Sequence, residues 1–412
     1  MKTRRQEDSE DALTISRRNN TQSPTSTNGR ENSEPIPVDI IYEILLKLPT
    51  KSIARCRCVS KLWSSILVRP DFTELFLTRS STRPQLLFAC EKKDELFFFT
   101  APQSQNPDGN SSLVSSSYQM KVHYDPFYSS QVCGDVRGLV CLTHRQVVKG
   151  RKETVPMICN PSTRQALPLP KVKTRKVKVR TFSIYDPIGK LFKLLSMTWL
   201  CYGNDDKNCK EYQILTLGKP SLPWRMIGCS MPHHPVHNGM IIDGCLYYQA
   251  MVGFGSGIST IVCFDVRSEK FRFVKKARGM SLYGESTLVN YEGRLGALQS
   301  GGLDISGTVD SHTRSLELWV LVDAEKHEWS KHLYVLPPMW KNVVAEESDL
   351  YIVGRTSTND IVLAPRYLSD VFYYNPERNT IKRVEFQGMD EFKKCRVHTF
   401  LDHMEDVKLM QL

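Results

Sequence analysis

Three neighbouring histidines are the residues of this sequence with the clearest potential for chemistry. The stretch MPHHPVH holds His233, His234 and His237, and imidazole nitrogens are common ligands of zinc. No fourth Cys or His follows at the spacing of a zinc site, and Pro232 and Pro235 stiffen the stretch. We therefore interpret the histidines as ordinary loop residues and expect no bound metal.

A basic stretch, KVKTRKVKVR at residues 171–180, has the charge needed to bind phosphates. Its lysines and arginines surround three valines, yet no aromatic residue lies between them to stack on bases. We interpret it as a charged edge strand or loop, which discourages pairing between sheets. We leave open that it forms part of a surface that binds another molecule.

Motifs of catalysis are missing from the rest of the sequence. The glycine-rich GFGSG at residues 253–257 is followed neither by Lys-Ser/Thr nor by a helical pattern, so we expect a hairpin connection there. No nucleophile elbow, Ser-His-Asp order or carboxylate pair stands out. The sequence predicts no catalytic residue, no cofactor and no enzyme activity.

Composition is typical of an intracellular globular protein. The 412 residues include 55 Lys and Arg against 44 Asp and Glu, and this scattered excess of +11 gives no reason to expect a nucleic-acid partner. The twelve cysteines contain no Cys-x-x-Cys pair, and the first residues lack a secretory signal. No apolar run approaches the ~20 residues of a membrane span. We expect reduced thiols in a cytoplasmic and/or nuclear protein.

Residues 1–34 form a polar tail. They are rich in Ser, Thr, Asn and charge and contain almost no large apolar residues. Such a segment cannot bury enough surface to offset the entropy of ordering, so we expect it to be disordered.

Residues 35–77 have the pattern of short helices. In the first helix, apolar residues recur every three or four positions and form one stripe: Ile40, Ile41, Ile44, Leu45 and Leu48. Asp39 suits the start of this helix, Pro49 ends it, and Thr50 can cap a second. A third runs to Ile66 and ends before Pro70. Three helices this short seldom fold alone, so the segment either packs on the rest of the chain or forms an interaction surface.

The spacing of these residues closely resembles the F-box. The matching positions are Ile36, Pro37, Asp39, Glu43, Ile44, Leu45, Leu48, Pro49, Lys51, Ser52, Arg57, Cys58, Val59, Ser60, Lys61 and Trp63, with Ile36 where the family usually has Leu. The resemblance implies that the segment binds a Skp-type adaptor, which links it to the cullin of a ubiquitin ligase. It also implies that eight residues supply much of the apolar contact, as a few large side chains do at many interfaces. They are Ile36, Pro37, Ile40, Ile44, Leu48, Pro49, Val59 and Trp63. Four basic residues around them could steer an acidic partner: Lys47, Lys51, Arg55 and Arg57.

After residue 84 the pattern changes to short β-branched and aromatic runs broken by turn residues. One sequence motif recurs: an apolar strand, a turn and another strand. Its turns are centred on Asn160, Lys219, Asp265, Asp323 and Asn375. Intervals of about 50 residues, with several strands in each, are typical of a β-propeller. About five units can be counted, and a sixth could form from residues 84–90 and 95–100 if they pair with a C-terminal strand. A β-sandwich is the alternative, because turn spacing does not fix the closure of a ring.

The same region resembles the plant F-box-associated domain of type 3. The pieces that match, in the family's order, include GLVCL, CNPSTRQALPLP, GCLYYQA, FDVRSEKF, LELWVLVDAEKHEWSK and FYYNPERN. The resemblance implies a domain that recruits substrates, without naming one.

Together these features predict a mainly β chain with a small N-terminal α unit. We expect a three-helix F-box at 35–77, a linker at 78–84, a β-propeller-like domain of repeated antiparallel sheets at 85–390 and a C-terminal segment at 391–412. The predicted function is the non-catalytic substrate-recognition subunit of an SCF-type (Skp-cullin-F-box) ubiquitin ligase, with an unknown target protein. The alternative is an enzyme or sugar-binding propeller whose helical segment only packs against the sheets.

Overall fold

The structure is a computed structural model, and it describes twelve stretches of the chain. They are residues 36–103, 113–124, 131–148, 151–174, 178–199, 210–218, 221–253, 258–280, 286–301, 308–344, 349–367 and 370–410. The chain divides into two compact units, residues 1–41 and residues 42–412. Within the described stretches, no helix has both the length and the apolar character needed to cross a membrane.

Four helices precede the first strand. They are α1 (Val38–Lys47), α2 (Thr50–Cys56), α3 (Lys61–Leu67) and α4 (Pro70–Ser81). The first three match the predicted helices, and α4 is additional. Pro70 begins it, because a proline in the first turn of a helix has no N–H to lose and already has a helical φ. The predicted linker at 78–84 therefore includes the end of α4.

The caps of these helices differ in part from expectation. Thr50 does not cap α2, because Pro49 occupies the N-cap position. The Thr50 hydroxyl instead donates to Oε1 of Glu405 at 2.8 Å. At α3, Ser60 is the cap, and its Oγ accepts the N–H of Trp63 at 3.1 Å.

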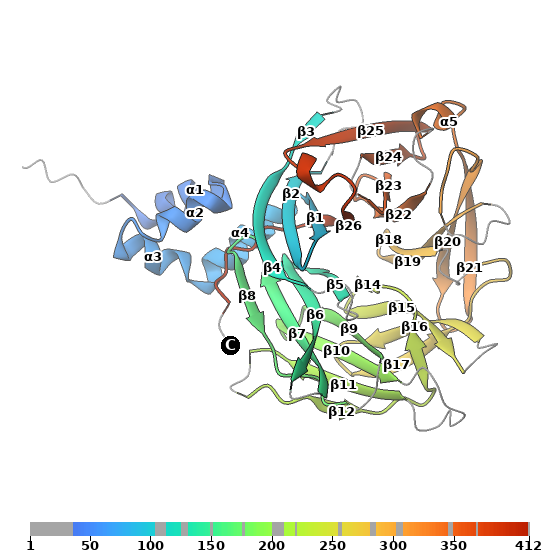
Figure 1. Ribbon diagram of the computed structural model, residues 1–412, viewed down its shortest axis with the longest axis horizontal. Helices are drawn as coiled ribbons and strands as arrows, with labels where there is room; N and C mark the ends of the chain where they lie inside the picture. Colours follow the sequence, from blue (N-terminus) through green and yellow to red (C-terminus); the bar gives the residue numbers. More distant parts are fainter. Residues whose placement is uncertain are drawn as a thin grey trace, which may run out of the picture. The chain divides into compact units, whose positions relative to one another are not determined.

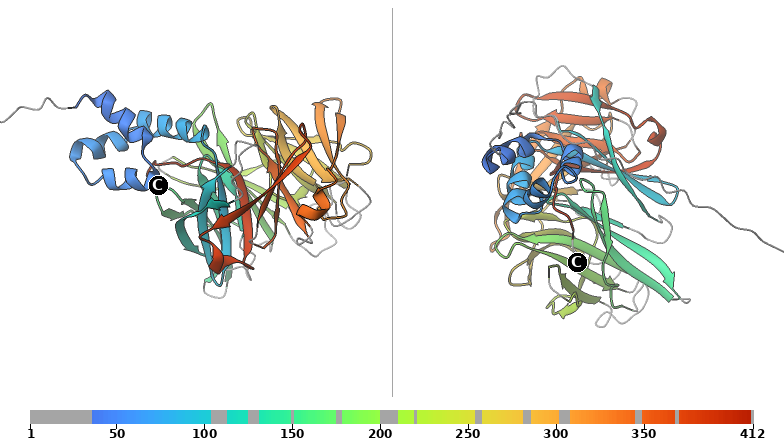
Figure 2. Two further views of the ribbon diagram at one scale, coloured as in Figure 1. Left: turned by 90° about the horizontal axis from the view of Figure 1, so that it is seen from above. Right: turned by 90° about the vertical axis from the view of Figure 1, so that its left-hand side faces the viewer.

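The described strands form six sheets arranged in a ring, a six-bladed β-propeller (Figure 1, Figure 2). Blade 1 contains β26 (Arg396–His403), β1 (Gln85–Lys92), β2 (Glu95–Pro102) and β4 (Ser117–His123). Blade 2 contains β5 (Gln131–Val136), β6 (Leu139–Val148), β7 (Arg151–Asn160) and β8 (Gln165–Pro168). Blade 3 contains β9 (Lys178–Asp186), β10 (Leu191–Trp199), β11 (Lys210–Thr216) and β12 (Arg225–Ile227).

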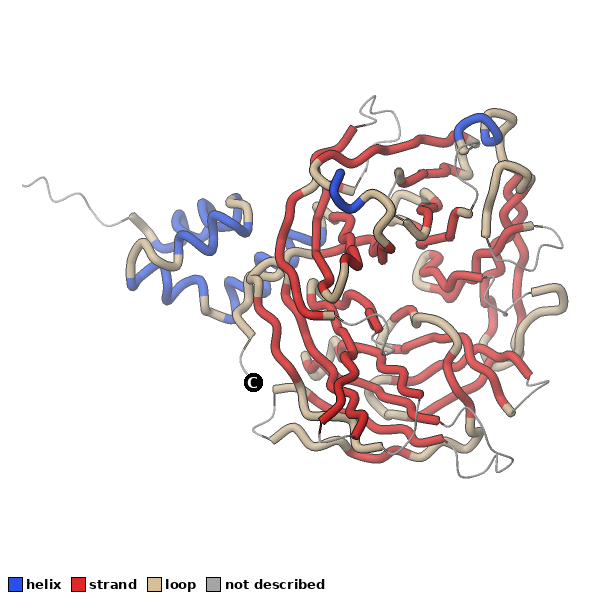
Figure 3. The backbone as a smooth tube through the Cα atoms, in the orientation of Figure 1, coloured by secondary structure: helices blue, strands red, loops and turns tan. Residues whose placement is uncertain are grey.

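The other three blades follow in chain order. Blade 4 contains β13 (His233–Pro235), β14 (Met240–Ile242), β15 (Cys245–Val252), β16 (Ile258–Asp265) and β17 (Lys270–Val274). Blade 5 contains β18 (Ser286–Tyr291), β19 (Arg294–Ser300), β20 (Ser315–Asp323) and β21 (Glu328–Val335). Blade 6 contains β22 (Leu350–Arg355), β23 (Ile361–Pro365), β24 (Val371–Asn375) and β25 (Thr380–Gln387), with β3 (Leu113–Ser115) parallel to β25. Two short helices, α5 (Trp340–Val343) and η1 (Asp390–Phe392), lie between strands of this region (Figure 3).

The ring is closed by its two ends. The C-terminal strand β26 pairs with β1, and Phe88 lies opposite Thr399. This confirms the predicted sixth unit, built from the first strands of the β region and a C-terminal strand. The predicted C-terminal segment from residue 391 therefore contains a blade strand. Six separate sheets exclude the β-sandwich alternative.

The apolar core lies between neighbouring blades. Each of the six blade-to-blade interfaces has its own cluster of buried side chains. Between blades 3 and 4, for example, Phe182 and Leu195 meet Tyr248 and Phe264. Because both faces of each sheet are covered, inner strands such as β16 are almost continuously buried instead of alternating between buried and exposed residues.

The recurring turn motif marks the hairpin between the last two strands of a blade. The side-chain oxygens of Asn160, Asp265, Asp323 and Asn375 each accept the backbone N–H of the residue three positions later. This is the bond that makes Asn and Asp favourable in tight turns. Lys219, the remaining predicted mark, lies outside the described residues.

Most of the described tight turns lie at one end of the propeller, which we call the short-turn face, while the two-residue turn between β1 and β2 lies at the other end. The short-turn face comprises the turns at 137–138, 161–164, 187–190, 243–244, 266–269, 292–293, 324–327, 356–360 and 376–379. Neighbouring blades meet there: the guanidinium of Arg137, in a turn of blade 2, lies 4.5 Å from the centre of the Tyr185 ring, near the end of β9. The start of β1 and the end of β26 are at this face too, since Gln85 pairs with His403. Longer connections join strand ends at the opposite end, which we call the long-loop face; they include those between β8 and β9, β17 and β18, β19 and β20, and β21 and β22.

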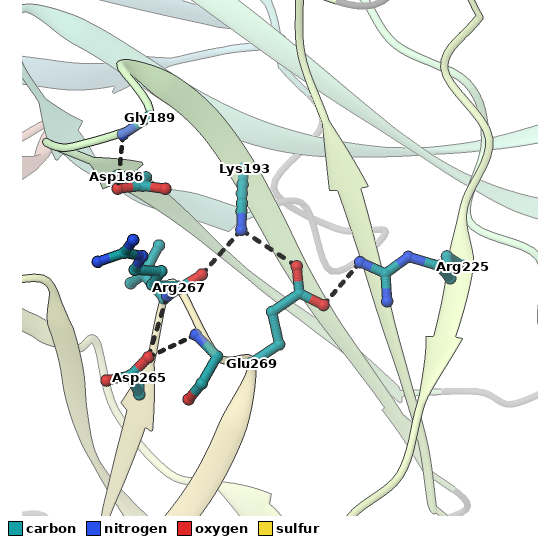
Figure 4. Close-up of polar contacts among 9 residues, drawn as sticks. Asp186, Gly189, Lys193, Arg225, Asp265, Arg267 and Glu269 are labelled. Atoms are coloured by element: carbon teal, nitrogen blue, oxygen red, sulfur yellow. Dashed lines mark hydrogen bonds and ion pairs between the residues drawn. The ribbon is translucent and has the colours of Figure 1, made fainter.

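One polar network joins blades 3 and 4 (Figure 4). The buried Nζ of Lys193 donates to the carbonyl oxygen of Val266 at 2.8 Å and to Oε1 of Glu269 at 3.1 Å. Nη2 of Arg225 donates to the other oxygen of Glu269 at 2.6 Å. Burial raises the pKa of Glu269, but the hydrogen bonds from Arg225 and Lys193 lower it further than burial raises it. The carboxylate thus connects β10, β12 and the turn after β16.

A buried carboxyl group follows the last strand. Burial raises the pKa of Asp406 from its ordinary 3.8 to about 6, so the folded chain holds this proton more tightly than the unfolded chain. Stability should therefore fall as the pH rises from about 4 to about 6. We expect Asp406→Asn to add up to about 3 kcal/mol to the free energy of unfolding at pH 7.5 and to flatten this pH dependence. Urea unfolding from pH 4 to pH 7.5 measures both effects, and an unchanged pH profile would contradict them.

Candidate adaptor-docking site

The apolar stripe of α1 has an exposed edge and a buried edge. Each residue of an α-helix is rotated by about 100° from the last, so the order around the helix is Ile40, Ile44, Leu48, Ile41 and Leu45. Exposure falls in that order. Ile40 is 51% exposed and Ile44 43%, Leu48 is half-buried, and Ile41 and Leu45 are 3% and 0% exposed. Only part of the apolar stripe is therefore buried, and the edge that carries Ile40 and Ile44 faces solvent.

Most of the other predicted contact residues are exposed as well. Ile36 and Val59 are 55% and 63% exposed, Pro37 and Pro49 are exposed, and Trp63 is half-buried. Sequence reasoning did not single out four further exposed apolar residues of this region as contacts: Val38, Leu62, Val68 and Leu75. For Leu62 a signal was available, because it follows Val59 at helical spacing.

Helix α4 supports this arrangement. The Tyr42 ring meets the Phe72 ring edge-on, with 5.4 Å between their centres. The Tyr42 hydroxyl donates to Oδ2 of Asp71 at 3.0 Å, and Nε of Arg69 donates to Oδ1 of Asp71 at 3.1 Å. The hydrogen bond from Arg69 is the main reason why the pKa of Asp71 lies below its ordinary value. Tyr42 thus joins the middle of α1 to the first turn of α4.

The basic residues of the helices divide into two groups. Lys47, Lys51 and Arg55 are exposed and remain available to attract an acidic partner. Arg57 is half-buried, its Nη2 donates to the carbonyl oxygen of Val407, and burial lowers the pKa of its guanidinium. Arg57 therefore serves an internal contact, which sequence reasoning did not foresee.

The three histidines lie at the start of blade 4. His233 is buried in β13, where Nε2 is 2.5 Å from the Tyr248 hydroxyl and Nδ1 is 2.9 Å from the carbonyl oxygen of Met231. The His234 ring stacks on Trp199. Burial lowers the pKa of His237. The described residues contain no group of three His, Cys, Asp or Glu side chains placed to hold a metal ion.

We expect the purified protein to contain far less than one zinc per chain. Both ring nitrogens of His233 already have hydrogen-bonding neighbours, so a metal would have to displace one of them. Elemental analysis of the full-length protein measures the zinc content. Zinc at one equivalent that is lost in a His233→Gln variant would contradict this expectation.

The structure describes only part of the basic stretch at 171–180 and of the GFGSG stretch at 253–257. Lys171 and Lys173 lie between β8 and β9, while Lys178 and Arg180 begin β9, the terminal strand of its sheet. Arg180 is not free to contact phosphates, because its guanidinium bonds to Asn238 and burial lowers its pKa. Residues 175–177 of the basic stretch and 254–257 of GFGSG lie outside the described residues.

Comparison with known proteins covers both parts of the chain. The F-box domain family matches residues 35–75, and the F-box associated beta propeller domain family matches residues 85–404. The F-box protein DOR of Arabidopsis thaliana is 50% identical over 92% of this chain and 95% of its own length. The F-box protein At5g65850 of the same plant is 48% identical over 100% of this chain and 99% of its own length.

A likeness to solved structures is much weaker. The β-propeller domain of the Trilobed protease from Pyrococcus furiosus overlaps 62% of this chain and 68% of that chain, at 14% identity and a TM-score of 0.35, too low to carry an argument. The two domain matches and the full-length plant relatives lead to one conclusion. This chain belongs to the F-box proteins that carry an F-box associated beta propeller domain.

Proposed function

We propose that this protein is the substrate-recognition subunit of an SCF-type ubiquitin ligase. The observation that carries the proposal is the exposed apolar edge of α1, where Ile40 and Ile44 face solvent although the opposite edge of the same stripe is buried. Large apolar side chains left exposed in a row are typical of a docking surface. Membership of the F-box family supports a Skp-type adaptor as the partner, with a cullin bound through it.

The eight residues proposed to contact the adaptor come from three segments. They are Ile36, Pro37, Ile40, Ile44, Leu48, Pro49, Val59 and Trp63. In this proposal Ile40, Ile44 and Val59 lose most of their exposed surface on binding, while Leu48 and Trp63, already half-buried, shape the surface beside them. Lys47, Lys51 and Arg55 attract an acidic adaptor to the same helices.

The propeller is proposed to bind the target protein. Its long-loop face is the favoured surface, because long connections on a rigid scaffold are where binding residues concentrate. The linker and the C-terminal segment leave from the short-turn face, so this surface carries neither. The chain itself would do no catalysis; it would hold the target near the ubiquitin-carrying enzyme, which acts through proximity. The assembly would form in the cytoplasm and/or the nucleus.

Reconstitution with a purified plant Skp-type adaptor tests the proposal. We expect the full-length chain to co-elute with the adaptor in equimolar amounts on a sizing column. We also expect the free chain to aggregate more readily than the complex, because the apolar edge is then uncovered. A well-behaved chain that never binds adaptor would favour the alternative of a propeller with its own ligand.

A further inference from the structure

The segment after the last strand, residues 404–410, contacts the helices on one side. The backbone N–H of Glu405 donates to Oγ of Ser80 in α4 at 2.6 Å, and its carboxylate accepts the Thr50 hydroxyl of α2 at 2.8 Å. Two residues on, the carbonyl oxygen of Val407 accepts Nη2 of Arg57, at the end of α2. Helices α2 and α4 thus each hydrogen-bond to this segment.

The same segment contacts blade 2 through the residues in between. Nδ2 of Asn160, at the end of β7, donates to the carbonyl oxygens of Asp406 and Lys408 at 3.0 and 3.3 Å. The backbone N–H of Met410 donates to Oε1 of Gln165 in β8 at 2.9 Å. Odd and even residues therefore bond to opposite partners, as expected when successive residues of a chain point to opposite sides.

The start of the segment is also held by close packing. A Cβ added at Gly138, whose φ is +79°, would lie 2.3 Å from the carbonyl oxygen of Met404. Beside it, the buried ring of His403 lies 2.7 Å from Oδ2 of Asp135. Both ends of the segment are thus seated on blade 2, and its middle reaches the helices.

We propose that residues 404–410 form a strap that holds helices α2 and α4 in a fixed orientation on blade 2, with Asn160 as its main positioning residue. The family domains match residues 35–75 and 85–404, so nearly all of the strap lies beyond both of them. A direct ion pair between Glu74 of α4 and Arg137, 3.0 Å apart, adds a second link. In an F-box protein such a strap sets where a target bound to the propeller is presented. This inference goes beyond the proposed function, since it concerns how the two parts are connected and not what either binds.

The turn at Asn160 offers a matched pair of variants. Asn160→Asp keeps the oxygen that accepts the N–H of Thr163 and replaces the amide that donates to the strap with a carboxylate oxygen, which repels the carbonyl oxygens of Asp406 and Lys408. Asp265 makes the same turn in blade 4 without any bond to the strap, so Asp265→Asn is the control. We expect Asn160→Asp to speed hydrogen exchange at least tenfold in residues 404–410 and in α2 and α4. The control should leave these segments unchanged.

A second variant guards against a simple folding defect. A chain ending after Met404 keeps β26 and the Asn160 turn but lacks the strap. We expect the truncated chain to keep the thermal unfolding of the propeller, because it introduces no buried charge. For both strap variants, small-angle scattering should show a broader range of dimensions than for the wild type. Faster exchange in 404–410 alone, with unchanged scattering and unchanged α2 and α4, would overturn the proposal.

Adaptor affinity separates this inference from the proposed function. We expect all three variants to bind the Skp-type adaptor within twofold of the wild type, because none changes the exposed edge of α1. If the wild type binds no adaptor, the proposed function fails, while exchange and scattering of the free chain still decide whether the strap exists.

Discussion

Replacing Ile40 and Ile44 together with Asp is expected to weaken binding of the Skp-type adaptor at least 100-fold and to leave the fold intact. Both side chains are about half exposed in the chain alone, so a charge there meets water and costs little stability. In the complex the same positions would be buried. Losing two apolar contacts of about 1.5 kcal/mol each, before the cost of burying charge, corresponds to a loss of about 100-fold.

Two further substitutions make this test specific. Ile188→Asp changes an isoleucine in the turn after β9 that is 70% exposed, and adaptor affinity should not change. Leu45→Asp places a charge at a position with 0% exposure on the opposite edge of α1 and should unfold the helices. Calorimetric titration gives the affinities and circular dichroism the helix content. Full affinity in the Ile40/Ile44 variant would show that the adaptor does not use this edge.

The exposed and buried edges of α1 show what the sequence of this helix could predict and what it could not. Periodicity placed Ile40, Ile41, Ile44, Leu45 and Leu48 on one side of α1, and the structure keeps them together. At about 100° per residue, these five side chains span about 140° around the helix. Periodicity could not say which part of this stripe other elements would cover. That depends on what packs on α1, and the start of α4, whose Phe72 meets Tyr42 of α1, was hidden because a proline can either end one helix or begin the next.

The repeated architecture of the propeller could be predicted from the sequence, but the long-range contacts of single side chains could not. Asn and Asp recur at its tight turns for a local reason, a bond to the backbone three residues on, and local chemistry can be recognised in sequence. Closure by β26 was foreseen only as a pairing of the two ends. The partners of Lys193 and Arg57 were not foreseen, because they lie 73 and 350 positions away in the chain and no short motif encodes such contacts.

Removing the ammonium of Lys193 is expected to be among the most destabilising single changes in the propeller. Lys193→Ala leaves the carbonyl oxygen of Val266 and one oxygen of Glu269 without this buried donor, while Arg225 still bonds to the other oxygen of Glu269. Breaking one side of a buried ion pair typically costs about 3–5 kcal/mol. The side chain of Lys193 is 9% exposed and that of Glu269 16%, so water can replace little of what is lost.

Two comparisons identify the cause of the loss. Lys331→Ala removes an ion pair with Glu317 that is shorter, 2.8 Å against 3.1 Å, but Lys331 is 42% exposed, and we expect a loss below about 1 kcal/mol. Lys193→Met combined with Glu269→Gln should recover much of the stability, because no buried charge is then left unpaired. Urea unfolding at pH 7.5 measures each difference, and equal losses in the two single variants would contradict the argument.

The pH dependence gives a separate check on the same network. The pKa of Glu269 lies below its ordinary 4.5 in the folded chain, where burial, which raises it, is outweighed by the hydrogen bonds from Arg225 and Lys193. A carboxyl group whose pKa is lowered by folding stabilises the folded chain fully when the pH is above the pKa of the unfolded chain. This stabilisation is lost as the pH falls below that value. As the pH falls below about 4.5, the wild type should therefore lose stability more steeply than the Lys193→Met, Glu269→Gln variant. Parallel profiles would mean that Lys193 stabilises the propeller by packing and not through its charge.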